Sequence, residues 1–99
     1  MLFATVYTPR GTGSEEEAKR ILQIWSQWKQ PAGMEIKAFY VLADQSGGII
    51  ISEASTAAAV LEAISPFAPY LDYNVTPIVE ITEAVPILQR VNAWRDSVG

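Results

Sequence analysis

Apolar residues recur three and four positions apart in three stretches of the chain, which is the spacing of one helix face. The first stretch follows a capping box. The Ser14 hydroxyl is expected to accept a hydrogen bond from the Glu17 N–H, while the Glu17 carboxylate returns to the N–H of the cap. This pattern predicts a helix over about residues 15–29. Its apolar stripe is formed by Ala18, Ile21, Leu22, Trp25 and Trp28.

The other two helices are predicted from shorter patterns. Ser55 is expected to cap a helix that runs to about Ser65, before a proline-rich segment. Its buried stripe is predicted to be Ala57, Val60, Leu61 and Ile64. A last helix begins at about Thr82, and Pro86 is expected in its first turn, where proline costs no hydrogen bond. Its stripe contains Ile87, Leu88, Val91 and Trp94.

Four β-prone runs separate these helices, at residues 2–8, 35–43, 49–52 and 71–81. The glycine pair at 47–48 predicts a tight antiparallel hairpin between the second and third runs. Pro77 interrupts the fourth run, so that strand is expected at an edge of the sheet or with a bulge.

The resulting order is β-α-β-β-α-β followed by a helix, which indicates an α+β, ferredoxin-like fold over a single domain, residues 1–99. Right-handed crossovers place the first two helices on one face of a four-stranded antiparallel sheet.

The other face of this sheet is expected to need a cover. Strands with one wet face alternate apolar and polar residues, but here apolar residues occupy both sides, most clearly at Ile49, Ile50 and Ile51. A patch of this kind drives association. We therefore expect a homodimer whose sheets pack face to face; the alternative cover is the C-terminal helix folded back on its own sheet.

Several blocks of the sequence, in this order and spacing, resemble a family of small proteins known only as a domain of unknown function within the dimeric α+β-barrel, ferredoxin-like group. The blocks are Ser14–Arg20, Tyr40–Asp44 with Gly47 and Gly48, Glu53–Ala54, Val75–Pro77 and Glu83–Val85. The resemblance covers nearly the whole chain. It implies the fold and a dimer, and it implies no activity.

The amino-acid composition excludes several kinds of functional site. The 99 residues include no Cys and no His, which excludes thiolate metal sites, thiol nucleophiles and imidazole ligation of haem. We expect no cofactor and no metal. The net charge of −4 disfavours nucleic acid as a partner. No apolar run approaches the length of a membrane span, and no signal peptide is recognisable, so a cytoplasmic protein is expected.

Six residues are candidates for a site. Glu53 follows an all-isoleucine run and is a candidate general base at the mouth of a cavity, with Tyr40 as a hydrogen-bond donor. The candidate ligand-binding residues are Tyr7, Arg10, Trp25 and Asn74. Each also has a purely structural interpretation, as a core aromatic, a solvated strand end or a loop residue.

The sequence favours a non-catalytic homodimer that binds a small apolar or aromatic molecule, or a protein partner. The alternative is a cofactor-free enzyme, similar to a monooxygenase or an isomerase, that acts on such a molecule in the cavity. A third interpretation is an assembly protein whose sheet face is fully used by the dimer.

Overall fold

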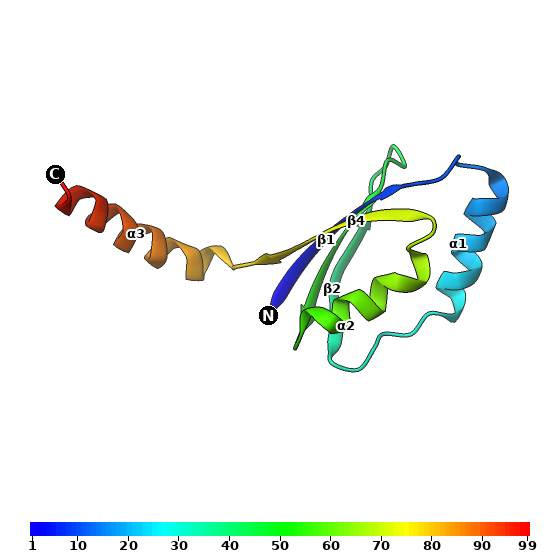
Figure 1. Ribbon diagram of the computed structural model, residues 1–99, viewed down its shortest axis with the longest axis horizontal. Coiled ribbons are helices and arrows are strands. Elements are labelled where there is room, and N and C mark those ends of the chain that lie inside the picture. Colours follow the sequence, from blue (N-terminus) through cyan, green and yellow to red (C-terminus); the bar gives the residue numbers. More distant parts are fainter.

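The computed structural model describes all 99 residues, and it confirms the predicted order of elements (Figure 1). The elements are β1 (Leu2–Pro9), α1 (Glu15–Gln27), β2 (Met34–Val41), β3 (Gly48–Ala54), α2 (Ala57–Ile64), the 3-10 helix η1 (Ser65–Phe67), β4 (Leu71–Ile78) and α3 (Ile81–Ser97).

The four strands form one antiparallel sheet in the order β2-β3-β1-β4, with α1 and α2 on the same face. This is the predicted α+β, ferredoxin-like arrangement. Pro77 lies in β4, which is an edge strand, as its missing N–H requires. Neither α1 nor α2 covers the other face of the sheet, which is named the open face.

The register of the strands decides which side chains face the helices. In β1 these are Phe3, Thr5 and Tyr7, and β3 contributes Ile50, Ser52 and Ala54 beside them. Phe3 is only 3% exposed and packs in a small core with Ala54, Ala59 and Val60. The core therefore lies at the end of the sheet that α2 covers.

Helix α1 begins as predicted at its cap, but the capping box is only half formed. The Ser14 hydroxyl accepts a hydrogen bond from the Glu17 N–H at 3.1 Å. The Glu17 carboxylate does not return to the cap. It accepts hydrogen bonds from the N–H and the hydroxyl of Thr12 instead, and it lies against Gly11, where a Cβ would overlap it. Glu17 thus fixes the loop before the helix as well as its first turn.

Helix α2 differs from the prediction in its cap and its buried face. The cap is Thr56, which accepts from the Ala59 N–H at 3.3 Å, whereas the Ser55 hydroxyl donates to the Gly33 carbonyl. The buried face also differs from the predicted stripe and shares only Val60 with it. Ala59, Val60 and Ala63 are buried, and Leu61 is 64% exposed.

Helix α3 projects away from the sheet and ends far from it (Figure 1). α3 makes no extensive contact with any other helix or strand, and none of its residues is buried. It therefore does not cover its own sheet, which was the alternative to a dimer. The helix begins at Ile81, one residue before the predicted Thr82, and Pro86 is its sixth residue. The prediction that Pro86 lies in the first turn was therefore wrong, and this proline removes one helical hydrogen bond.

Candidate functional site

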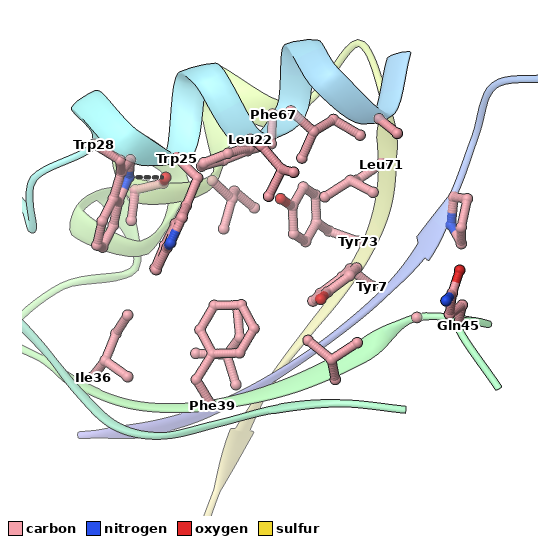
Figure 2. Close-up of a pocket in the computed structure, with 18 of the residues that line it drawn as sticks. Tyr7, Leu22, Trp25, Trp28, Ile36, Phe39, Gln45, Phe67, Leu71 and Tyr73 are labelled. Atoms are coloured by element: carbon pink, nitrogen blue, oxygen red, sulfur yellow. Dashed lines mark hydrogen bonds between the residues drawn. The ribbon is translucent and has the colours of Figure 1, made fainter. Parts of the chain in front are cut away.

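A cavity of about 630 Å³ lies between α1 and the sheet (Figure 2). Most of its lining residues are hydrophobic, and they come from every strand, both covering helices and η1. The lining is Tyr7, Pro9, Ala18, Ile21, Leu22, Trp25, Trp28, Met34, Ile36, Phe39, Val41, Gln45, Gly47, Ile50, Ala63, Ile64, Phe67, Leu71 and Tyr73. The volume lies within the range of small-molecule sites, roughly 300–1,000 Å³.

One wall of the cavity is the whole apolar stripe predicted for α1. None of these side chains is buried, and Leu22 remains 66% exposed because the stripe faces the cavity. The helix is held at its end by the Trp28 indole, which donates to the Ala63 carbonyl of α2 at 2.9 Å. Protein interiors contain few voids larger than a water molecule, so an apolar wall left this open is typical of a binding site.

Aromatic rings connect the walls of the cavity. The Trp25 ring stacks on Trp28 at a centroid distance of 5.4 Å and forms a T-shaped contact with Phe39 of β2 at a centroid distance of 5.6 Å. Phe39 in turn lies 6.1 Å from the Tyr7 ring. Figure 2 shows the Trp25 indole N–H directed into the cavity. Flat apolar surfaces on both walls favour a ligand that is itself flat and aromatic.

Two tyrosines from neighbouring strands supply the polar groups at one end of the cavity. Tyr7 and Tyr73 are cross-strand partners in the β1–β4 pair, and their ring centroids are 6.1 Å apart. Gly48 makes room for Tyr7, since a Cβ at this glycine would overlap the ring. Neither phenol forms a hydrogen bond with another residue that lines the cavity (Figure 2). Both hydroxyls are therefore available to a ligand.

Burial raises the pKa of the Tyr7 phenol above its usual 10.0. Burial also raises the pKa of Tyr73, more strongly, and the charge on ionised Tyr7 adds to that effect. Both groups are thus neutral hydrogen-bonding groups at physiological pH. They are the only titratable side chains among the lining residues, so the cavity presents no charge to a ligand.

We expect the free energy of unfolding to fall as the pH rises above about 10, because the phenols ionise in the unfolded chain while Tyr73 stays protonated in the folded protein. Below that pH both states are protonated and the phenols contribute no pH dependence. Urea unfolding at about pH 8 and at about pH 11 measures the loss, which Tyr73→Phe should reduce. An equal loss in wild type and variant would contradict the assigned environment of Tyr73.

The structure places two of the six candidate residues, Tyr7 and Trp25, in the cavity. The other strand candidates lie on the open face, since the pleat directs Glu53, Tyr40 and Asn74 away from the helices. The Glu53 carboxylate is exposed and accepts a hydrogen bond from the N-terminal amine at 3.0 Å. It is therefore not at the mouth of the cavity, and the geometry does not support its expected role as a general base there.

Arg10 also lies outside the cavity. Its guanidinium forms an ion pair with Asp72 of β4 at 2.7 Å, and its backbone N–H donates to the Tyr70 carbonyl. This candidate ligand-binding cation is thus paired with a carboxylate of β4 in the structure.

Sequence reasoning missed three aromatic residues of the site, Phe39, Phe67 and Tyr73. Tyr73 and Phe39 follow the every-second-residue spacing of strands, so the sequence indicates that each shares a sheet face with its neighbours two residues away. The sequence does not indicate which of the two faces lies against the helices. Phe67 lies in the short helix η1, between two prolines, where no periodicity identifies a buried side.

The model of one protein family matches residues 1–92 of the chain, so this protein belongs to the family described as a domain of unknown function (DUF3303). No curated protein matches the chain with significant similarity.

None of the helices of the protein is long and apolar enough to cross a membrane. No cluster of three or more carboxylate side chains has the arrangement needed to hold a metal ion.

Proposed function

We propose that this member of the DUF3303 family binds a small, neutral, aromatic molecule in the cavity between α1 and the sheet. The observation that supports this most directly is the open apolar wall of α1, which faces aromatic side chains of the sheet across about 630 Å³. The ligand packs against the Trp25 and Phe39 rings, which line the cavity together, and directs a polar group to the hydroxyls of Tyr7 and Tyr73.

The chemistry of the lining selects against charged molecules. Transferring an ionised group into an apolar site without a partner is unfavourable, and the lining offers neither a cation nor a carboxylate. A phenol, by contrast, leaves most of its surface in contact with the rings and exchanges a hydrogen bond with a tyrosine hydroxyl.

Binding of 2-naphthol, measured by isothermal titration calorimetry, tests the proposal. We expect 2-naphthol to bind at least about tenfold more tightly than naphthalene-2-carboxylate, which has the same ring system and carries a charge. Equal affinity for the two compounds, or no heat with either at millimolar concentration, would contradict a neutral aromatic site.

A pair of neighbouring substitutions on α1 locates the binding. Ala18 lines the cavity, whereas Lys19, the next residue, does not. Ala18→Phe is expected to fill part of the cavity and weaken 2-naphthol binding about tenfold or more. Lys19→Phe adds the same side chain outside the cavity and should leave the affinity within about twofold. Equal effects of the two variants would place the ligand elsewhere.

We also propose that the protein is a homodimer and that a second copy covers the open face. Apolar residues form a continuous band across this face, on all four strands. The band, which we call the apolar band, consists of Leu2, Ala4, Val6, Ala38, Tyr40, Ile49, Ile51 and Ile78. Its Val6 and Tyr40 side chains are 43% and 66% exposed in the single chain. Contact with a second copy removes this patch from water.

A further inference from the structure

We propose that the two copies exchange their C-terminal helices, so that α3 of each chain packs on the apolar band of its partner. This inference rests on the homodimer proposed for the open face and is independent of the ligand in the cavity. It assigns the cover of the band to one element of the second copy, the helix α3.

The single chain has too much surface for its mass. Its accessible surface is 7194 Å², whereas a compact monomer of 10.9 kDa is expected to expose about 5,600 Å². Its radius of gyration is 17.7 Å, against about 13 Å for a compact domain of this length. The excess of roughly 1,600 Å² per chain matches what each subunit buries in a stable homodimer.

α3 extends away from the rest of the chain with no buried residue (Figure 1), and most of its apolar residues lie on one side. At about 100° per residue they occupy roughly half of the helix circumference. They are Ile81, Ala84, Val85, Ile87, Leu88, Val91 and Trp94. The opposite side carries Thr82, Glu83, Gln89, Arg90 and Asp96, while two polar residues near the C-terminal end, Asn92 and Arg95, fall on the apolar side. An apolar side of this width, with Trp94 67% exposed and Ile81 71% exposed, is typical of a helix that packs on another surface.

Two local features weaken α3, although Glu83 in its first turn and Arg95 in its last turn complement the helix dipole. Glu80 makes no side-chain capping bond, and Pro86 removes a hydrogen bond inside the helix. The first turn of an isolated helix is costly to form, and most helical stability in proteins comes from the packing of an apolar face. The stability of α3 therefore depends on a packing partner.

The geometry and the charges favour a partner in another chain. Only Val79 and Glu80 separate α3 from β4, Glu80 is extended, and the helix leaves the end of the sheet instead of turning back across it (Figure 1). Residues 1–80 contain five bases and nine acids, so they carry the whole net charge of −4, while residues 81–99 contain two of each and are neutral. A neutral helix on the partner's apolar band lets the two acidic bodies associate with little repulsion.

A two-fold axis makes this contact reciprocal. In such a dimer the same contact occurs twice. The α3 helix of the first chain packs on the apolar band of the second, and the α3 helix of the second packs on the apolar band of the first. The two unpartnered apolar surfaces of the chain are thereby covered by each other, and no surface is left to continue into a polymer.

Two neighbouring substitutions on α3 test the exchange, with association measured by analytical ultracentrifugation. Leu88→Glu places a charge on the apolar side of the helix and is expected to raise the dimer dissociation constant at least about 30-fold. Gln89→Glu introduces the same side chain on the polar side and should change it less than about threefold. Circular dichroism checks that both variants retain the folded body.

Mixing two defective chains tests which surface α3 contacts. Leu88→Glu keeps an intact band, and Val6→Glu keeps an intact helix, so only their heterodimer contains one intact helix-on-band contact. We expect the mixture to form heterodimers at concentrations where each variant alone is monomeric. Tyr40→Glu, at an exposed edge-strand position of the band, replaces Val6→Glu if that variant does not fold.

The outcomes separate the helix exchange from the dimer itself. A wild-type chain that is monomeric at micromolar concentration overturns both. A dimer that tolerates Leu88→Glu overturns the exchange and leaves a dimer formed by the sheets alone. A dissociated variant without rescue in the mixture also overturns it, because α3 would then contact another part of the partner. Binding of 2-naphthol is a separate measurement that none of these results decides.

Discussion

Replacing Phe3 with alanine is expected to lower the free energy of unfolding by about 3–5 kcal/mol, which is a large share of the stability of a small domain. Phe3 is 3% exposed and packs against Ala54, Ala59 and Val60, which are small side chains on rigid elements. These neighbours cannot move into the space that the ring leaves, so the variant loses the burial of the ring and gains a cavity.

Urea unfolding followed by circular dichroism measures this loss at one fixed protein concentration, because the proposed dimerisation would make stability concentration-dependent. Leu61→Ala is the matched control. The helical pattern predicted Leu61 to be buried, but it is 64% exposed, so its truncation should cost less than about 1 kcal/mol. Comparable losses for the two variants would mean that the buried side of α2 has been assigned incorrectly.

Gly48→Ala is expected to destabilise the protein by about 2 kcal/mol, because the new methyl group overlaps the ring of Tyr7 and forces that ring out of its place. The displaced ring enters the cavity that it lines, so 2-naphthol binding should weaken in the same variant. Gly48 does not have a left-handed backbone, so the cost is steric contact with one side chain.

A double-mutant cycle isolates this contact. In a Tyr7→Ala background the ring is absent, and Gly48→Ala should then cost less than about 0.5 kcal/mol, since alanine is at least as favourable as glycine in a strand. Gly47→Ala is the control, because its methyl group would overlap the backbone carbonyl of Tyr7, which Tyr7→Ala does not remove. If Tyr7→Ala rescued both variants equally, or neither, the Tyr7 ring would not be the obstacle at Gly48.

The sequence by itself determined the elements and their order, because these depend on interactions between residues close in the chain. The stripe from Ala18 to Trp28, the Ser14 cap and the glycine pair at 47–48 act within a few residues of one another. The β-α-β-β-α-β order then leaves few topologies, since crossovers are right-handed. The missing N–H of Pro77 left two possibilities, an edge strand or a bulge, and the structure has β4 at an edge.

Only the tertiary structure decided which side of each strand faces the helices. The strands are apolar on both sides, so the alternation that normally identifies the buried side is absent. The β1–β4 register brings Tyr7 beside Tyr73 and directs Glu53 and Tyr40 to the open face. A one-residue change of register would exchange these sets, and no local interaction in the sequence selects between them.

The direction of α3 was likewise decided by the tertiary structure. The amphipathic pattern predicts that this helix packs on something, because its apolar side gains free energy when it leaves water. The pattern does not identify the surface. That depends on the path of the chain through Val79 and Glu80 and on the shape of the whole sheet, which sequence periodicity does not encode.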